Sequence, residues 1–496
     1  MIDQIAEQWP RVAVIILNYN GKRFFDTCLE ALAKTDYPSD RLDVIVVDNA
    51  SQDGSVAYVR EHFPAVRVLA LNQNLGFSGG NNAAIQLVSR SKLQVSGSTD
   101  QIHPTYVVLL NNDTAVDPGW LKPLVCAAEA DPTVGGCGSK LVFFYERLPL
   151  TLAIAGSFSP ERDLGSSDSR VLGVRLAGVD LIGSGPSAHV GYGAGWYDGE
   201  GSGDGAYRWT SDRAVLDLPI ADRDAPLDLR LRFAGGPPDP LPPAQVTLTI
   251  GETVLQMIDV GRDPVTIDLV IPPELVAHAQ RFIQNAGQEL LPGGYCRDRG
   301  SYVENGVEQH VPDGTYEQQE EVFGLCGAAM LLRCDMLDQI GLLDERFFMY
   351  YEDTDLCWRA RFAGWKMIYV PRSIVRHIHS GSSGAWSPLF RFHVERNRLL
   401  MLIKNAPRDL AIGAVREYVR ETGAWIGRSV RAARHGRHSF RASWFYVINN
   451  TRVLVSLLKL LPYTLRQRRL IRRGTTVDDA AILAWTIDPR MYANTR

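Results

Sequence analysis

Residues 12–21 read VAVIILNYNG, and this stretch decides the fold of the N-terminal region. The run through Leu17 is apolar without interruption and rich in β-branched side chains, which is typical of a parallel strand covered on both faces. It ends at Asn18, and apolar residues at helical spacing follow through Leu32. The stretch therefore predicts a buried strand, a polar turn and a helix, which together form one unit of a layered α/β fold.

The same pattern recurs along the chain, because apolar strand-like runs alternate with helical segments and each run ends in polar residues. Strands alternating with helices predict a doubly wound, parallel sheet, in which ligands bind at the carboxyl ends of the strands. The further strands are expected at 42–47, 66–71 and 106–110, and the polar clusters that follow them at 48–55, 72–82 and 111–114.

The polar clusters suit a nucleotide. Asp48 and Asn49 offer an acceptor and an amide for a base edge or ribose hydroxyls, and the glycines that begin at Gly76 allow backbone N–H groups near a phosphate. Asp113 is a natural divalent-metal ligand where a diphosphate supplies further oxygens. Each residue also has a structural interpretation as part of a turn or loop. No GxGxxG or P-loop pattern occurs, which disfavours dinucleotide and ATP sites.

In a second informative stretch, residues 344–359, three acidic residues directly follow a run of aromatic residues. Glu352, Asp353 and Asp355 lie close to rings that are normally buried, and burial and like charge both raise a carboxyl pKa toward the range of a general base. The alternative is a helix N-terminus, where acids complement the macrodipole. Both interpretations can hold together.

Between these regions the periodicity changes. From about 156 to 278 strict alternation replaces helical spacing, as at 227–233 and 265–271, which predicts an inserted antiparallel β-sandwich. Trp196 and Trp209 lie among glycines in this region and suit either the sandwich core or a platform for sugar rings.

Composition sets the broad class. Apolar residues make up 45% of the chain and charged residues 22%, as in globular proteins, and a net charge of -4 gives no reason to expect nucleic acid as a partner. Seven scattered cysteines suggest reduced thiols in a cytoplasm. We expect neither a signal peptide nor a membrane-spanning helix.

The C-terminal region is helical and basic. Basic residues flank the apolar stretch 457–463, which suits an anionic membrane surface, although helix faces packed on the catalytic part explain them equally well. The preceding arginines are Arg428, Arg431, Arg434, Arg437 and Arg441, and those that follow are Arg466, Arg468, Arg469, Arg472 and Arg473.

Six motifs, in this order, resemble the family 2 glycosyltransferases, and more narrowly the rhamnosyltransferase-like members of bacterial polysaccharide assembly. They are VIILNYN (14–20), VVDNAS (46–51), NLGFSGGNN (74–82), LLNNDT (109–114), GLCGAAMLLR (324–333) and YYEDTDLCWR (350–359). The resemblance covers roughly residues 11–150 and 280–405.

The resemblance implies a GT-A fold: a Rossmann-like, mostly parallel α/β sheet, here with the inserted β-sandwich and a helical C-terminal region. We expect a nucleotide-sugar-binding half at 1–155, the sandwich at 156–278, a catalytic and acceptor-binding half at 279–405, and the basic helices at 406–496.

The family's functional residues transfer to matching positions. Asp353 and Glu352 would be the catalytic residues, with Asp353 as the base and Glu352 as its neighbour. Asp113 and His377 would hold Mg²⁺ or Mn²⁺, although Asn111 stands where the family's first metal-binding acid is expected. The donor would be bound by Asn18, Asn20, Asp48, Asn49, Asn74, Gly76, Asn81 and Asn112.

The implied reaction is inverting transfer of a sugar, with rhamnose a candidate, from a nucleotide-diphosphate donor to an oligosaccharide or lipid-linked glycan acceptor. A peripheral location at the inner face of the cell membrane fits such an acceptor. One rival is a non-catalytic glycan-binding protein built on a degenerate transferase core, which Asn111 leaves open. A nucleotidyltransferase is disfavoured because residues 18–23 are too short for a triphosphate-binding loop.

Overall fold

The structure, a computed structural model, describes residues 9–90, 104–182, 188, 190–201, 203–304, 307–378, 387–432 and 437–488. Residues 1–8, where we expect no signal peptide, lie outside this set. The chain forms two compact units, which we call unit 1 (Met1–Val142 with Ile283–Arg496) and unit 2 (Phe143–Phe282).

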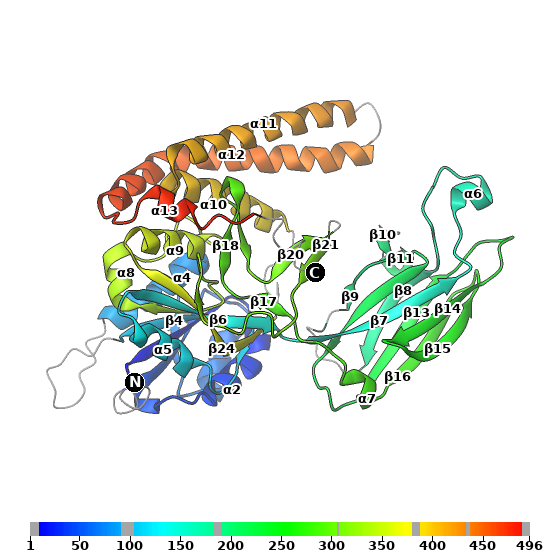
Figure 1. The fold of residues 1–496 in the computed structure, drawn as a ribbon, viewed down its shortest axis with the longest axis horizontal. Coiled ribbons are helices and arrows are strands. Elements are labelled where there is room, and N and C mark those ends of the chain that lie inside the picture. Colours follow the sequence, from blue (N-terminus) through cyan, green and yellow to red (C-terminus); the bar gives the residue numbers. More distant parts are fainter. Residues whose placement is uncertain are drawn as a thin grey trace. The chain divides into compact units, whose positions relative to one another are not determined.

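Unit 1 is built on one sheet with a hydrophobic core on each face (Figure 1). In β1 (Val12–Asn18), Val14 and Ile16 belong to one core and Ile15 to the other. This alternation is why the strand is apolar throughout. Helices α2 (Phe25–Ala33), α3 (Ser55–His62) and α5 (Leu121–Ala130) contribute to the first core, and α4 (Gly76–Arg90), α8 (Cys334–Ile340) and α9 (Glu352–Phe362) to the second.

The strand order of this sheet is β22-β24-β6-β23-β4-β1-β2-β3, with β17 beside β6 and β5 beside β24. It is parallel across β4, β1, β2 and β3, and antiparallel where β23 pairs with β4 and β6. The other strands are β2 (Leu42–Asp48), β3 (Arg67–Ala70), β4 (Tyr106–Asn111), β5 (Thr114–Val116), β6 (Val134–Phe143), β17 (Ile283–Asn285), β22 (Glu320–Glu321), β23 (Ala329–Arg333) and β24 (Lys366–His377).

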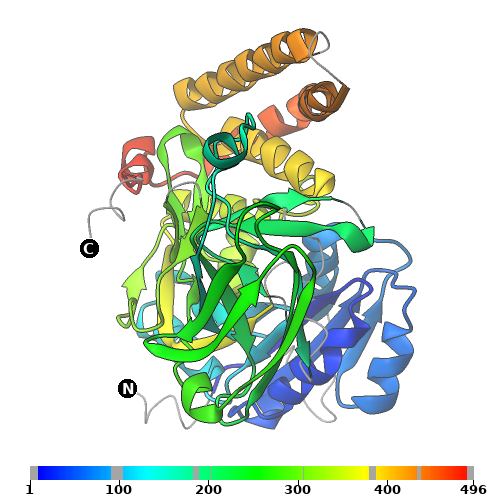
Figure 2. The same cartoon turned by 90° about the vertical axis from the view of Figure 1, so that its right-hand side faces the viewer.

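Unit 2 consists of two five-stranded sheets, β10-β11-β8-β13-β16 and β15-β14-β7-β12-β9, whose strands are teal to green in Figures 1 and 2. Their inward residues, such as Leu150 and Leu231, share one core, and the paired strands are antiparallel. The strands are β7 (Glu146–Ala155), β8 (Arg175–Ile182), β9 (Gly191–Tyr192), β10 (Trp196–Glu200), β11 (Tyr207–Thr210), β12 (Arg213–Ile220), β13 (Leu227–Gly235), β14 (Ala244–Ile250), β15 (Thr253–Val260) and β16 (Val265–Ile271). The mixed α/β fold with an inserted antiparallel sandwich is thus confirmed.

Unit 2 begins earlier than the expected residue 156, because β7 is already one of its strands and pairs with β12 and β14. The chain enters and leaves unit 2 at neighbouring points. The Phe143 amide donates to the Phe282 carbonyl over 3.1 Å, and in unit 1 Val142 pairs with Ile283.

The two tryptophans of the sandwich are both engaged within unit 2. The Trp196 indole N–H donates to the Val215 carbonyl over 2.7 Å, and its ring packs against the sandwich core. Trp209 contacts the Phe158 ring edge to face, and the Arg175 guanidinium lies over it. Each ring is half-buried and is held by contacts within unit 2.

The C-terminal part is helical, as expected. It comprises α10 (Pro388–Asn405), α11 (Arg408–Ala432), α12 (Arg437–Arg473) and α13 (Asp479–Leu483). A third cluster of unit 1 joins α9 to α10, α11 and α12 through residues such as Trp358, Leu400 and Leu457. Arg434 lies outside the described residues, as do the side chains of Arg437 and Arg441. Among the helices that the structure describes, none has the length and apolar character needed to cross a bilayer.

Candidate active site

The ends of the parallel strands meet at one edge of the sheet. Pairing sets Asn18 opposite Asp48, and Leu17 opposite Asn111. The Asn112 amide donates to Asn18 Oδ1 over 2.7 Å, and the Asn18 amide donates to Asp48 Oδ1 over 3.0 Å. The second Asp48 oxygen accepts from the Ser51 backbone N–H. Each carboxylate oxygen of buried Asp48 thus has one internal partner and keeps a second acceptor position.

Most of the other expected donor residues hold loop backbone at this edge. Asn20 Oδ1 accepts from Gln52 N, and the Asn49 amide donates to the Gly76 carbonyl. Gly76 N donates to Asn74 Oδ1, and the Asn81 amide donates to the Phe77 carbonyl. Gly76 has φ +71°, and a Cβ there would collide with the Phe348 carbonyl. The structure brings these residues to the same edge of the sheet, with several of their side chains used to fix the loops.

Asp113 and His377 lie together at the same edge. His377 Nε2 is 3.1 Å from Asp113 Oδ1, and the Asn111 amide is 3.3 Å from the same nitrogen. Asp113 follows β4, while His377 ends β24, whose pairing with β5 sets it opposite Thr114. On its other side, His377 Nδ1 lies 2.8 Å from Gln284 Oε1.

This pair fits a divalent cation. Because Gln284 Oε1 can only accept, Nδ1 carries a proton, and Nε2 faces the Asp113 carboxylate. A ring nitrogen and a carboxylate oxygen at this distance can share a divalent cation, and an imidazole held at Nδ1 by an acceptor is the usual arrangement of a metal-ligating histidine. Within the described residues, no group of three or more His, Cys, Asp or Glu side chains gathers as a metal site, so a bound ion would need oxygens from elsewhere.

Asp353 lies at the first turn of α9 and is held by three N–H donors. Oδ2 accepts from the Gly327 backbone N–H over 3.0 Å and from the Gln288 amide over 3.1 Å. Oδ1 accepts from the N–H of Thr354 over 2.7 Å, and the Thr354 hydroxyl, whose shorter contact is with Gln288 Oε1, lies 3.3 Å from it. Burial raises the pKa of Asp353 above its usual value, and these donors oppose that rise by favouring the ionised form. The result is a fixed carboxylate with increased basicity.

The dipeptide Gly327-Ala328 connects the two clusters. Gly327 donates to Asp353, and the Ala328 carbonyl accepts from Asn111 N over 2.9 Å. A Cβ at Gly327 would lie against Phe77 and Asp353 Oδ2. The small residue therefore lets backbone approach the carboxylate directly. Asn111 is hydrogen-bonded to Ala328, the residue next to the one that contacts Asp353.

Glu352 differs from its neighbour. It is buried, and its Oε2 has no hydrogen-bond partner. Burial, followed by the charge of Asp353, raises the pKa of Glu352 well above its usual value. Because the two carboxyls adjoin, the charge of Asp353 adds to burial in favouring the neutral form of Glu352.

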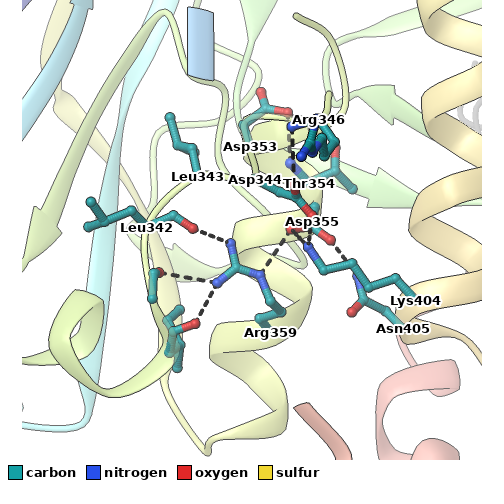
Figure 3. Close-up of polar contacts among 12 residues, drawn as sticks. Leu342, Leu343, Asp344, Arg346, Asp353, Thr354, Asp355, Arg359, Lys404 and Asn405 are labelled. Carbon is teal, nitrogen blue, oxygen red and sulfur yellow. Dashed lines mark hydrogen bonds and ion pairs between the residues drawn. The ribbon is translucent and has the colours of Figure 1, made fainter. Parts of the chain in front are cut away.

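Asp355, the third acid of the stretch, is structural. Figure 3 shows its carboxylate between Arg359 and the pair Lys404 and Asn405, with Asp353 pointing away from this cluster. The Lys404 ammonium also contacts Asp344 Oδ2 over 2.6 Å. Burial alone would raise the pKa of Asp355, but Lys404 and Arg359 outweigh it and hold the pKa below its usual value. The cluster ties α9 to α10 and to the loop before α9.

The loop leading into α9 is strained. Phe348, Tyr350 and Tyr351 have φ of +67°, +70° and +68°, which costs about 1–3 kcal/mol for each non-glycine residue. Buried Asn397 compensates, because its amide donates to the carbonyls of Phe347, Met349 and Tyr350. The Phe348 carbonyl in turn accepts from the first turn of α4. The loop, held in this conformation by its hydrogen bonds, thus fixes the start of α9 and the position of Asp353 in its first turn.

A separate cavity of about 920 Å³ opens on the other side of this loop. Asn74 and Phe348 reach it, but Asp113, His377 and Asp353 do not. It is bounded by residues 339–346 and the second half of α12, and it reaches Asp344, Arg359 and Lys404 of the Asp355 cluster, but it is distinct from the sites at Asp353 and at Asp113 with His377.

Four residues of this arrangement have no role in the sequence-based expectations: Gln284, Gln288, Gly327 as a backbone donor, and Asn397. Gln284 and Gln288 follow the insertion and match no motif, and Asn397 looks like any polar residue of a helix. The small-residue run at 324–329 was the one available signal, since it predicts close backbone approach.

Comparison with known proteins gives two family matches, the first of which runs from unit 1 into the beginning of unit 2. A sequence model described as "Glycosyl transferase family 2" matches residues 13–177, and one described as "Glycosyltransferase like family 2" matches residues 309–394. The two ranges contain Asp48, Asp113, Asp353 and His377.

Curated relatives match over short segments. An N-acetylglucosaminyl-diphospho-decaprenol L-rhamnosyltransferase of Mycobacterium tuberculosis is 45% identical over 60 residues, or 12% of this chain and 20% of the relative. The rhamnosyltransferase WbbL of Escherichia coli K12 is 34% identical over 86 residues, or 17% of this chain and 33% of the relative. This chain therefore spans a fifth to a third of these relatives' lengths.

One similar solved structure is that of GalNAc-T7, crystallised with UDP, GalNAc and Mn²⁺. The superposition covers 90% of this chain and 55% of the GalNAc-T7 chain, with 12% sequence identity and a TM-score of 0.40. Because this TM-score is low, the structural similarity adds nothing to the assignment, which rests on the sequence matches at residues 13–177 and 309–394. On those matches, the chain belongs to the family 2 glycosyltransferases.

Proposed function

We propose that this protein transfers a sugar from a nucleoside-diphosphate donor to a hydroxyl of a growing glycan, with inversion at the anomeric carbon. The observation that carries the proposal is the connection of two clusters through Gly327-Ala328: a fixed carboxylate, Asp353, and the pair Asp113 and His377. Group transfer needs a base and a site for the leaving diphosphate, and the two clusters suit those tasks.

In this mechanism the oxygen of the acceptor hydroxyl attacks the anomeric carbon, and Asp353 accepts the proton of that hydroxyl. The new carbon–oxygen bond forms on the face opposite the breaking bond to the diphosphate, and this inverts the anomeric configuration. Gly327 and Gln288 keep the carboxylate in place throughout, and its raised pKa makes it a better proton acceptor than an ordinary aspartate.

Asp113 Oδ1 and His377 Nε2 would hold Mg²⁺ or Mn²⁺, and Asn111 would contribute its amide oxygen after rotation of the amide. When bound, the ion would neutralise charge on the departing diphosphate. Asp48 and the asparagines around it would bind the nucleoside, since Asp48 retains acceptor capacity for ribose hydroxyls.

The sugar and the acceptor belong to the same proposal. Relatives named as rhamnosyltransferases, one of which by name acts on N-acetylglucosaminyl-diphospho-decaprenol, support rhamnose as the donor sugar and a lipid-linked glycan as the acceptor. The seven free cysteines fit a reducing cytoplasm.

Thermal stability tests the donor site first. Because a ligand that binds only the folded state stabilises it, a matching nucleoside diphosphate at one hundred times its Kd adds about 2.7 kcal/mol. We expect this stabilisation with Mg²⁺ or Mn²⁺ and its loss with EDTA. His377→Ala should reduce the metal-dependent stabilisation, whereas His62→Ala, at an exposed position of α3, should not. Stabilisation by oligosaccharides but by no nucleotide would instead identify a glycan-binding protein.

Contact with the membrane would involve α12. Between residues 437 and 473 it carries Lys and Arg but no Asp or Glu. Trp444, Ile448 and Val455, which are 44%, 48% and 46% exposed, lie on one side of it. Together with Arg452 and Lys459 they line an open groove of about 590 Å³. Exposed apolar residues beside cations suit the interface of an anionic bilayer.

Co-sedimentation with lipid vesicles tests this contact. We expect binding to vesicles that contain anionic lipid, weaker binding as salt screens the charges, and a loss in Ile448→Asp. Val270→Asp, which makes the same change at a 68% exposed position of unit 2, is the matched control. Equal sedimentation with purely zwitterionic vesicles, or no effect of Ile448→Asp, would argue against α12 as the contact.

A further inference from the structure

The first residues of unit 1 after the insertion reach both halves of the candidate site. Gln284 lies in β17 and Gln288 three residues beyond it, and both side chains are buried, with exposures of 5% and 7%. Buried glutamines need partners for both ends of the amide. In this segment the partners include Asp353 and His377.

Gln288 holds Asp353 in one orientation. The Thr354 hydroxyl donates to Gln288 Oε1 over 3.0 Å, and the amide nitrogen points the other way. There it donates to Asp353 Oδ2 over 3.1 Å. The ionised carboxylate can only accept, so Asp353 fixes which end of the amide faces it. Gln288 thereby supplies a side-chain donor to the oxygen that Gly327 also contacts.

Gln284 performs the corresponding task for His377. Its Oε1 lies 2.8 Å from Nδ1, which fixes the ring and leaves Nε2 facing Asp113. Partners of this kind typically account for about 10- to 100-fold in metal affinity.

A rigid turn separates the two glutamines. Asn285 Oδ1 accepts from Gly287 N over 2.8 Å, and the Asn285 amide donates to Asp298 over 2.7 Å. Gly287 has φ +107°, and a Cβ there would press on Val322. The spacing between Gln284 and Gln288 is therefore set by backbone geometry that only glycine adopts easily.

We propose that residues 284–288 form a positioning segment that serves both reactive clusters, with Gln288 orienting Asp353 and Gln284 orienting His377. This inference rests on the proposed function, because it assigns the two clusters the roles of base and metal ligand. Neither glutamine touches the reacting atoms. Each acts through the residue that it holds.

The experiment compares Gln288→Leu and Gln284→Leu in the full-length protein. Gln288→Leu should lower kcat by about 10- to 100-fold, as expected for loss of an orienting partner, with little change in donor KM. The acid limb of its pH–rate profile should move to higher pH, since removing a donor to the carboxylate raises the pKa of Asp353 further. Its metal requirement should stay as in the parent protein.

Gln284→Leu should give the opposite pattern. The Mn²⁺ concentration needed for half-maximal thermal stabilisation in the presence of nucleotide should rise by about 10- to 100-fold. The acid limb should stay in place. Gln284→Glu keeps an acceptor for Nδ1 and should restore metal affinity, and Gln245→Leu, at an exposed position of unit 2, controls for the substitution itself.

Two results would overturn the inference. One is the same loss of stability and activity in both leucine variants, without separate pH and metal signatures, which would make the segment merely structural. The other is an unchanged acid limb in Gln288→Leu together with unchanged metal affinity in Gln284→Leu. Failure of the proposed function is distinguishable, because the parent protein itself would then show neither stabilisation by a nucleotide nor sugar transfer.

Discussion

Asp353→Asn should lower the rate of sugar transfer by about 10²- to 10⁴-fold, the usual contribution of a general base, while nucleotide-sugar binding persists. The amide has nearly the shape of the carboxylate and can still accept from Thr354, so the local fold should survive. It cannot take up the acceptor proton. Release of nucleoside diphosphate measures turnover, and thermal stabilisation by the donor measures binding in the same preparation.

Glu352→Gln is the matched control, because it makes the same chemical change one residue earlier. Burial and the charge of Asp353 raise the pKa of Glu352, which favours its neutral form, and glutamine imitates that form. This variant should retain most of its turnover. If it lost as much activity as Asp353→Asn, or if Asp353→Asn turned over normally, the base would have to be reassigned.

Lys404→Met should destabilise unit 1 by about 3–5 kcal/mol, the usual cost of removing one partner from a buried ion pair. Lys404 is 3% exposed and bridges Asp344 and Asp355, which are also buried. Without the ammonium, Asp344 keeps only neutral donors, Tyr463 and a backbone N–H. Asp355 keeps Arg359 and Asn405 but loses one of its two charged partners.

Urea denaturation, followed separately for the two units by hydrogen exchange, measures this loss. Unit 2 contains no part of the cluster and should keep its stability, which provides an internal reference. Lys366→Met is the external control, because its partner Asp131 lies at the surface, where an ion pair contributes about 0–1 kcal/mol. An equally small effect of Lys404→Met would mean that the cluster is not needed to hold α9.

The fold was predictable where burial alone determines sequence. A strand covered on both faces must be apolar at every position, as in β1, and a sandwich strand must alternate, as in β13. The start of unit 2 was harder to predict. β7 alternates too, but Pro149 interrupts its pattern, and it directly follows the unit 1 strand β6.

Within the site, sequence could gather the acids but could not assign their separate tasks. Glu352, Asp353 and Asp355 look alike in the chain, and their partners lie far from them in sequence. Lys404 neutralises Asp355, Gln288 holds Asp353, and Glu352 has an oxygen with no partner at all. These partners follow only from tertiary packing, and so does the contrast between Asp355, whose pKa is lowered, and the other two acids, whose pKa values are raised.

The entry and exit of unit 2 have an evolutionary meaning. Because Val142 pairs with Ile283 and Phe143 bonds to Phe282, the ends of the insertion meet as the two arms of a hairpin do. For the sheet of unit 1, a whole domain thus occupies the place of a turn. Such a domain can be gained, lost or exchanged over generations without shifting any strand register, so its ancestry need not be that of the enzyme that carries it.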